Sequence, residues 1–185
     1  MYKEMKHIGK KLFQSGMNNS HSGNISVRNG HKILISRTAS MLDELEKTDL
    51  VRVNLKADPN KDKKASMELL VHRSIYMADK GVRAVVHAHC PYSTAMADGV
   101  VEIIPYDEEG KYFLKRINVV DVPNTIASGE VAAEIGQYIE KNHCVVVARH
   151  GVFSWGKDLE EAFHYITVCE SACRINYLME SKNAS

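Results

Sequence analysis

The sequence predicts an α/β fold, a three-layer αβα sandwich with a mixed, largely antiparallel central sheet. Short β-prone runs and helical patterns alternate along the chain, and this mixture favours one sheet covered by helices on both faces. A Rossmann fold is not indicated, because no GxGxxG follows the first predicted strand and no GxxxxGK followed by Ser or Thr occurs. The chain has 185 residues, enough for a well-formed core, and we expect a single domain over residues 1–185.

Four elements are predicted before residue 65. Apolar residues at helical spacing, among them Met5, Ile8 and Leu12, indicate an amphipathic helix that Gly16 ends. Asn29-Gly30 is a strong turn dipeptide and predicts a hairpin between the β-prone runs on its two sides. The predicted elements are a helix over 2–16, strands over 25–28, 32–35 and 50–55, and then a solvated polar loop over 57–64.

Capping residues define the helices in the rest of the chain. Ser66, Ser128 and Asp158 are suited to N-caps, and Pro91 to the first turn of a helix. A turn over 107–110 separates two short β-prone runs. The predicted elements are helices over 66–81, 91–98, 128–141 and 158–179, and strands over 82–86, 101–105, 112–114, 118–122, 144–148 and 152–155.

The most informative short motif is His87-Ala88-His89, which follows the apolar run 82–86. Residues i and i+2 of a strand point to the same side, so the two imidazoles share a face at the carboxyl end of a buried strand. A single histidine beside an apolar run is more often structural, but two unpaired buried imidazoles carry a desolvation cost unless something holds them. The pair therefore favours a metal site or an active site.

Two further residues complete a set of metal ligands. Glu68 lies in the helical segment upstream of the histidine pair, and His150 lies between the apolar runs 144–148 and 152–155. Three histidines and a carboxylate suit Zn²⁺. Three protein nitrogens with a displaceable fourth ligand are the catalytic arrangement, whereas structural zinc sites are closed and usually rich in thiolates. These residues thus predict a catalytic metal site.

Composition argues against several other classes of protein. The net charge is +1 and no basic stripe with interleaved aromatic residues occurs, so we do not expect nucleic acid as the main partner. No apolar stretch approaches about 18 residues and the N-terminus does not resemble a signal peptide, so no membrane association is expected. Four cysteines without a CxxC pair fit reduced thiols in a cytoplasm. Cys169 and Cys173 share a helix face with small core residues and Cys90 would point away from the histidines, so none is assigned to the metal.

Five motifs occur in order along the chain. They are Gly23-Asn24-Ile25-Ser26-Val27, Ile35-Ser36-Arg37-Thr38, Ser66-Met67-Glu68 with His72 four residues on, Val85-Val86-His87-Ala88-His89, and Arg149-His150-Gly151-Val152 followed by Gly156-Lys157-Asp158-Leu159-Glu160-Glu161-Ala162. With these motifs the sequence resembles the class II aldolase and adducin head-domain family over nearly its whole length. The resemblance is greatest to short, archaeal-like members that act on L-fuculose 1-phosphate.

The resemblance implies a metal-dependent carbon–carbon lyase. His87, His89 and His150 match the family's zinc ligands, and Glu68 matches the carboxylate that is the fourth ligand at rest and the base during turnover. One Zn²⁺ per chain is implied, with another divalent ion as an alternative, and it would act as a Lewis acid. The implied reaction is the reversible cleavage of a ketose 1-phosphate such as L-fuculose 1-phosphate into dihydroxyacetone phosphate and a short aldehyde such as lactaldehyde.

The resemblance also implies a phosphate site. Asn24, Thr38 and Ser66 match the family's phosphate-contacting positions, although each alone is an ordinary turn, strand-end or capping residue. The family usually has a glycine after the threonine and a second serine before the glutamate, where this chain has Ala39 and Met67. These two departures weaken the prediction of the substrate.

The remaining implications concern the proton donor and the assembly. Tyr106 falls near the family's position for the acid that protonates the leaving oxygen, and Tyr112 is the alternative. The resemblance implies a cytoplasmic homotetramer with active sites at subunit interfaces.

Two other classes of function stay open. The same scaffold could dehydrate a methylthioribulose 1-phosphate, or epimerise a pentulose phosphate at carbon 4, although Glu68 stands where the epimerase would lead one to expect aspartate. The other class is a non-catalytic, adducin-like interaction module. The complete set of metal ligands argues against it, because such a module has no reason to retain them.

Overall fold

The computed structural model describes residues 1–183, and its centre is one eight-stranded sheet with the strand order β3-β2-β1-β4-β8-β7-β6-β5. Every neighbouring pair is antiparallel except β6 and β7. The predicted mixed, largely antiparallel sheet is therefore confirmed. The strands are β1 (Asn24–Asn29), β2 (Lys32–Ser36), β3 (Leu50–Asn54), β4 (Ala84–Ala88), β5 (Glu102–Ile103), β6 (Ile117–Val120), β7 (Cys144–Val147) and β8 (Gly151–Gly156).

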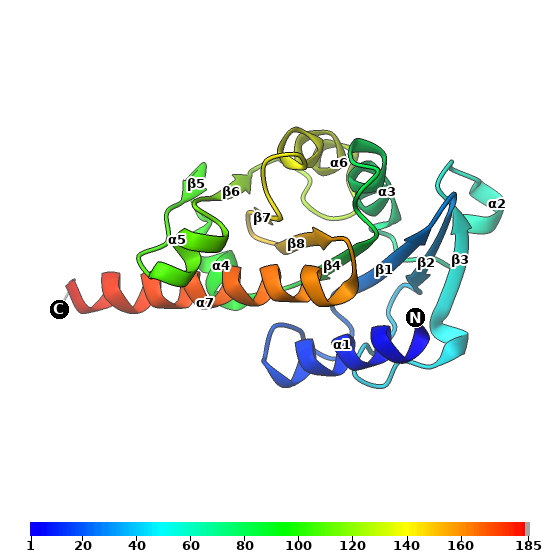
Figure 1. The fold of residues 1–185 in the computed structure, drawn as a ribbon, viewed down its shortest axis with the longest axis horizontal. Coiled ribbons are helices and arrows are strands. Elements are labelled where there is room, and N and C mark those ends of the chain that lie inside the picture. The colour runs from blue at the N-terminus through cyan, green and yellow to red at the C-terminus, as the bar shows by residue number, and fades with distance from the viewer. Residues whose placement is uncertain (184–185) are drawn as a thin grey trace.

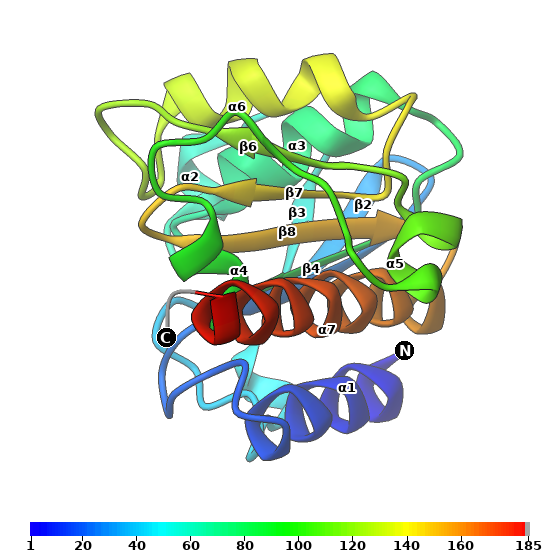
Figure 2. The ribbon, with the colours of Figure 1, turned by 90° about the vertical axis from the view of Figure 1, so that its left-hand side faces the viewer.

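Helices cover both faces of the sheet, which confirms the three layers (Figures 1 and 2). On one face lie α1 and α7, with α4 and α5 against α7, and on the other face lie α3 and α6. None of the helices among the described residues is both long and apolar enough to span a bilayer. The helices are α1 (Tyr2–Gln14), α2 (Pro59–Asp62), α3 (Leu69–Ala78), α4 (Pro91–Met96), α5 (Glu108–Phe113), α6 (Gly129–Ile135) and α7 (Leu159–Asn183), with short 3-10 turns at η1 (Lys47–Asp49) and η2 (Gly136–Tyr138).

Strand β4 is buried on both faces, because it lies in the middle of the sheet. Val86 packs into the core beneath α1 and α7, and Val85 packs into the core beneath α3 and α6. Side chains alternate along a strand, so His87 shares the α3 and α6 face with Val85. The strand thereby directs the first histidine of the pair toward α3.

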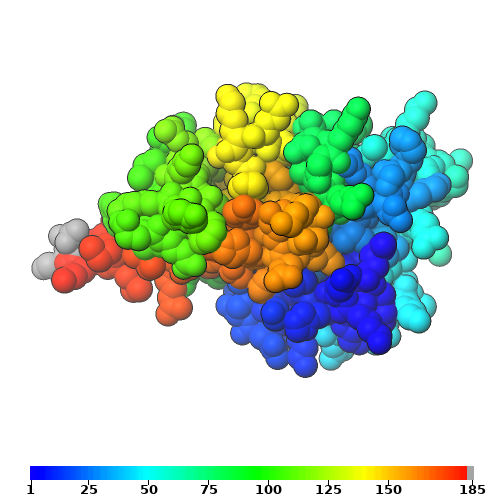
Figure 3. Space-filling view, viewed as in Figure 1, coloured from blue at the N-terminus to red at the C-terminus, as the bar shows by residue number. Residues whose placement is uncertain are grey.

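Helix α1 closes the lower edge of the molecule beside the first turns of α7 (Figure 3). Its apolar stripe of Met5, Ile8 and Leu12 is buried, as its helical spacing predicts. Gly9 lies on the same side, where an added Cβ would overlap the carbonyl oxygen of Leu42. The loop that follows β2 can therefore pack directly on the helix.

Three sequence-based predictions are wrong in detail. The strand over 112–114 and the turn before it are one helix, α5, because the Asp107 side chain accepts the Gly110 N–H at 2.8 Å and caps the segment. The loop 57–64 contains the short helix α2, which Asp58 caps in the same way. Helix α3 begins after Glu68, whose backbone N–H donates to the Ser66 hydroxyl, so Ser66 supports the turn before the cap.

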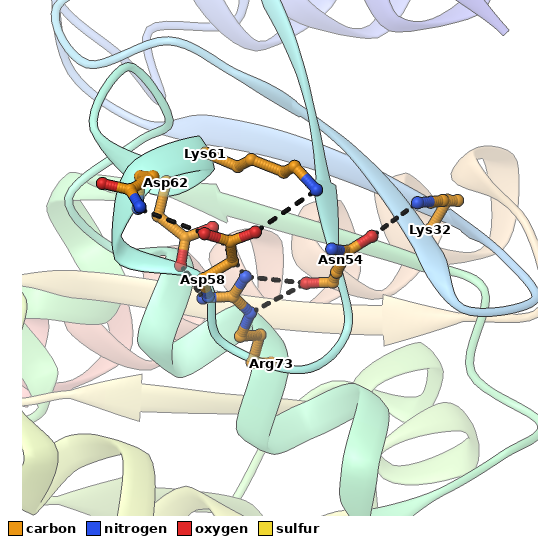
Figure 4. Close-up of polar contacts among 7 residues, drawn as sticks. Lys32, Asn54, Asp58, Lys61, Asp62 and Arg73 are labelled. Atoms are coloured by element: carbon orange, nitrogen blue, oxygen red, sulfur yellow. Dashed lines mark hydrogen bonds and ion pairs between the residues drawn. The ribbon is translucent and has the colours of Figure 1, made fainter.

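A buried arginine fastens α3 to the end of β3 and to α2 (Figure 4). The Arg73 guanidinium donates to both carboxylate oxygens of Asp62, at 2.7 and 2.8 Å, and also to the backbone carbonyl of Asn54, at 2.7 and 3.1 Å. The Arg73 side chain is only 7% exposed. Its hydrogen bonds lower the pKa of the Asp62 carboxyl group below its usual value. The contact therefore holds in place the helix that Glu68 directly precedes.

Replacing this arginine should destabilise the fold. Arg73→Ala leaves the Asp62 carboxylate without its charged partner. It should lower the free energy of unfolding by about 3 kcal/mol, as for other broken buried ion pairs. Urea unfolding measures this change. The matched control is Lys61→Ala, which removes the exposed ion pair with Asp58 and should change the same free energy by less than about 1 kcal/mol. Equal losses in the two variants would contradict a special role for Arg73.

Candidate metal and active site

The predicted metal and phosphate ligands gather at one end of the central sheet. In the strand register His87 lies opposite Asn24 of β1 on one side and Phe153 of β8 on the other. The carboxyl ends of β4 and β7 therefore lie beside the amino ends of β1 and β8. The donor nitrogens of His87, His89 and His150 all lie within 4.8 Å of one another.

His87 presents one ring nitrogen to this cluster. Its Nδ1–H donates to the backbone carbonyl of Val152 at 2.9 Å, which leaves the lone pair on Nε2. That Nε2 atom is buried and has no hydrogen-bond partner among the described residues. The ring stacks on Phe153 with centroids 4.0 Å apart and 14° between the planes. Backbone and packing thus fix the ring so that its free nitrogen faces the other histidines.

Backbone contacts from two other segments position His89 and His150. The Asn18 side chain accepts the His89 backbone N–H at 3.1 Å, just beyond the end of β4. His150 lies in the β7–β8 turn after Arg149, which has a φ of +59°. Such a left-handed backbone is costly for a residue with a side chain, and it often occurs at functional sites. The Arg149 guanidinium pairs with Asp121 at 2.6 Å and so supports this turn.

Burial keeps the three imidazoles neutral. It lowers the pKa of His87 well below the usual value, and the neighbouring His150 and His89 lower it further. Burial likewise lowers the pKa of His89, and it lowers the pKa of His150 to about 4 with a contribution from His89. Neutral imidazole is the form that binds a metal, so the cluster is ready to ligate near neutral pH.

Glu68 brings a buried carboxylate next to the histidines. Its Oε1 accepts the Ala127 N–H at 2.9 Å and lies 3.8 Å from Nε2 of His150. Its Oε2 is buried and has no partner among the described residues. Burial raises the pKa of this carboxyl group, and the hydrogen bond from Ala127 opposes the rise. One oxygen is therefore held while the other stays free.

The donor set fits a divalent metal ion of the Zn²⁺ type. Three neutral histidine nitrogens form the donor group, and the Glu68 carboxylate borders it, with Oε1 3.8 Å from Nε2 of His150. Both His87 Nε2 and Glu68 Oε2 are buried polar atoms that need a partner. None of the four cysteines belongs to the donor cluster; they are unpaired and buried in the core. A site of three nitrogens and one movable carboxylate leaves a position for substrate.

The three candidate phosphate ligands lie around the same end of the sheet. The Thr38 hydroxyl donates to the carbonyl of Ala65 at 2.9 Å, and the Ser66 N–H donates to the carbonyl of Ser36 at 3.0 Å. These bonds hold the segment after β2 against the turn before α3, and Asn24 lies at the adjacent end of β1.

The residue after Thr38 has an unusual backbone conformation. Ala39 has a φ of +59°, the left-handed region that glycine enters without strain. The chain therefore keeps here a backbone typical of glycine although it carries alanine.

The two candidate proton donors lie elsewhere in the chain. Tyr106 is 49% exposed, its hydroxyl donates to Glu180 at 3.5 Å, and its backbone N–H donates to Asn176 on α7. Tyr112 is 79% exposed and packs on Phe113. Neither touches a histidine of the donor cluster within the described residues. The structure of one chain thus does not bring either tyrosine to the metal ligands.

Several residues that shape the site were not singled out from the sequence. Asn18 lies in a polar loop, where asparagine is common, and the Ala127 contribution is a backbone N–H that no residue type signals. The sequence motif identifies His72 only by its spacing from Glu68. In the structure His72 is fully buried between Ser26 and Asn24. The one sequence feature that points to a special role for His72 is its position on the apolar, buried face of a helix.

Comparisons with known proteins identify the family and agree with the fold. The model of the Class II Aldolase and Adducin N-terminal domain family matches residues 3–177. The L-fuculose phosphate aldolase of Methanocaldococcus jannaschii is 31% identical over 176 residues, which cover 95% of each protein. The methylthioribulose-1-phosphate dehydratase of Alcanivorax borkumensis is 23% identical over 90% of this chain and 85% of its own length. The crystal structure of L-fuculose-1-phosphate aldolase from Thermus thermophilus superposes with a TM-score of 0.94 and 27% identity, covering 100% of this chain and 96% of that one.

Proposed function

Because the chain belongs to the class II aldolase and adducin N-terminal domain family and is an enzyme of its aldolase group, we propose that it cleaves a ketose 1-phosphate such as L-fuculose 1-phosphate. The products would be dihydroxyacetone phosphate and a short aldehyde such as lactaldehyde. The observation that carries this proposal is the convergence of three neutral histidines beside the buried Glu68 carboxylate, whose Oε1 lies 3.8 Å from Nε2 of His150.

We propose that one Zn²⁺ is held by His87, His89 and His150, with Glu68 as the fourth ligand in the resting enzyme. Another divalent ion with similar ligand preferences is the alternative. When bound, the ion supplies a Lewis acid for the substrate's carbonyl oxygen. The neutral imidazoles and the hydrogen bond from His87 Nδ1 to Val152 support this assignment, because they leave ring nitrogens free to ligate.

Glu68 is the proposed base. In the condensation direction it takes a proton from the carbon next to the carbonyl of dihydroxyacetone phosphate, and in cleavage it returns that proton. The Ala127 N–H holds Oε1, so the unpaired Oε2 is the atom available to the proton. Its raised pKa supports the assignment, because a base works best when its pKa approaches the working pH.

We propose that Asn24, Thr38 and Ser66 bind the phosphate group. The Ser66 hydroxyl accepts the Glu68 N–H and keeps its own proton free to donate to an anion. The left-handed backbone at Ala39 supports the proposal, because turned backbone amides are a common part of anion sites.

A neighbouring subunit would supply the proton donor, and we propose a cytoplasmic homotetramer with active sites between subunits. Tyr106 follows β5, at the far edge of the sheet from β1 and four strand spacings from β4, about 19 Å at the usual spacing. Its exposed ring supports a role in another copy's site rather than its own. Tyr112, also exposed, is the alternative donor.

A dehydratase is the second candidate. Met67 stands where the family usually has a phosphate-binding serine, and a relative matching 90% of this chain is named methylthioribulose-1-phosphate dehydratase. The same metal ligands and base would serve either reaction. The epimerase and the non-catalytic module have less support, because Glu68 and all three histidines are present.

Product analysis separates these reactions. Metal-loaded protein incubated with L-fuculose 1-phosphate and other ketose 1-phosphates should release dihydroxyacetone phosphate, measured with a coupled reductase. The unphosphorylated ketose should react poorly, and Thr38→Val and Ser66→Ala should weaken competition by inorganic phosphate while the metal content stays unchanged. Loss of water from methylthioribulose 1-phosphate, without any dihydroxyacetone phosphate from the panel, would favour the dehydratase instead.

A further inference from the structure

A buried histidine on α3 connects the core to the candidate phosphate site. His72 lies one turn after Glu68, and its side chain has no exposed surface. Its Nε2 is 2.6 Å from Oδ1 of Asn24, and its Nδ1 is 2.7 Å from the hydroxyl of Ser26. The Ser26 hydroxyl is in turn 2.7 Å from the hydroxyl of Tyr76, one helical turn further along α3. These contacts form a continuous chain of hydrogen bonds from Tyr76 to Asn24.

The donor and acceptor in each of these hydrogen bonds follow from the Asn24 side chain. The carbonyl oxygen Oδ1 of Asn24 can only accept, so His72 must carry its proton on Nε2. Its Nδ1 then has a lone pair and accepts the Ser26 hydroxyl proton, which leaves the Ser26 oxygen to accept from Tyr76. Burial lowers the pKa of His72 to about 3, which keeps the ring neutral with a single N–H. Every donor and acceptor in the chain is thereby assigned.

With its Oδ1 toward His72, the Asn24 amide has its NH₂ group on the other side. The Asn24 Oδ1 atom accepts a hydrogen bond from His72, and the Asn24 Nδ2 group has no hydrogen bond to another described residue. Asn24 lies directly opposite His87 in the β1–β4 register, so the two side chains lie on the same face of the sheet. An NH₂ group suits an anionic oxygen, whereas a flipped amide would present its own carbonyl oxygen and repel it.

We propose that His72 is a positioning residue that holds the Asn24 amide with its NH₂ group toward the phosphate of the substrate. This inference rests on the proposed function in one respect, namely that the substrate carries a phosphate near Asn24. Ser26 and Tyr76 complete the arrangement by fixing the tautomer of His72. The substrate's anion is thus recognised partly through a residue that never touches it.

A purely structural role for His72 has to be separated from this one. The His72 ring packs edge-on against Phe153 at 5.9 Å, and Phe153 stacks on the metal ligand His87. A cavity at His72 could therefore disturb the metal site through Phe153. The useful variants are a pair of similar size that differ in their ability to donate a hydrogen bond.

His72→Gln and His72→Met form such a pair, because only glutamine retains a donor for Asn24. We would titrate each metal-loaded variant with inorganic phosphate, follow binding by the shift in melting temperature, and measure the metal content. His72→Met should raise the dissociation constant of phosphate about tenfold or more, since the Asn24 amide is no longer held in place for its hydrogen bond to the charged phosphate. His72→Gln should stay within about threefold of the wild type, and both variants should keep their metal. With substrate, the methionine variant should raise KM more than it lowers kcat.

A double-mutant cycle and the His72 tautomer complete the test. His72→Met should have little further effect on phosphate binding in an Asn24→Ala background, because the two residues act as one unit. Additive effects, or equal phosphate binding by the glutamine and methionine variants, would overturn the inference. Nitrogen-15 NMR of the wild-type holoenzyme should show the Nε2–H tautomer of His72, and an Nδ1–H tautomer would overturn it even if the methionine variant does not fold. A wild type that binds no phosphate overturns the proposed phosphate site itself, and that result differs from each of the others.

Discussion

Glu68→Gln should leave the metal bound and should slow the exchange of the dihydroxyacetone phosphate proton with solvent by about two orders of magnitude or more. Glutamine keeps the size of the side chain and one oxygen, and the three histidines still hold the metal, but its amide does not accept a proton at neutral pH. The Ala127 N–H can still donate to this oxygen, so the side chain should remain in position. Deuterium incorporation into dihydroxyacetone phosphate, followed by mass spectrometry, measures the rate.

The control for this variant is Glu170→Gln. Glu170 is also a carboxylate with several hydrogen bonds: it accepts from the Tyr92 N–H and from both the N–H and the hydroxyl of Ser93. It belongs to α7, however, and its partners are in the first turn of α4, so it takes no part in the metal site. Its replacement should lower stability without abolishing exchange. Exchange at the wild-type rate in Glu68→Gln, with the metal still bound, would show that another group is the base.

The order of strands and helices could be predicted because local signals dominate them. Asn29-Gly30 does join β1 to β2, and Asp158 does cap α7 by accepting the Glu161 N–H at 2.8 Å. The prediction fails at α5, where β-prone Tyr112 and Phe113 are outweighed by the Asp107 cap and two acidic residues in the first turn. A strand there would also need a partner, and β6 already pairs with β5 and β7. Sheet pairing of this kind is not visible in a short window of sequence.

The candidate metal ligands could be predicted because their chemistry is uncommon and their spacing is local. His87 and His89 share a face by the strand period alone, whereas the approach of His150 and Glu68 depends on the register of β4 with β8 and on the packing of α3. Asn18 and Asn24 show the limit of this approach. Their roles depend on partners 71 and 48 residues away, at His89 and His72, so no local pattern identifies them. Tyr106 shows a different limit, because a residue that is proposed to act in the site of another copy cannot be placed by the structure of one chain.

His89→Ala and His87→Ala should each empty the metal site. Wild-type protein should carry about one divalent ion per chain by elemental analysis. Each variant loses one of the three nitrogen ligands and keeps two nitrogens and the displaceable Glu68 carboxylate, so its affinity should fall far enough for the ion to be lost on dialysis. The His89 variant is easier to interpret, because the wild-type His89 ring is only half-buried, whereas removal of the His87 ring also leaves a cavity beside Phe153. His31→Ala, an exposed histidine in the β1–β2 turn, is the matched control and should keep the ion.

Metal binding should also be visible in the stability of the fold, independently of any activity. An ion present at about 100 times its dissociation constant stabilises the native state by about 2.7 kcal/mol, which raises the melting temperature of a chain of this length by about 5 to 11 °C. A chelator should therefore lower the melting temperature of the wild type and of His31→Ala by that amount, and should leave that of His89→Ala unchanged, because that variant has no ion to lose. A full complement of metal in His89→Ala, with the same response to chelator, would contradict the assigned site. The buried His87 Nε2 and Glu68 Oε2 atoms, which have no hydrogen-bond partner among the described residues, would then need a partner other than an ion shared with His89.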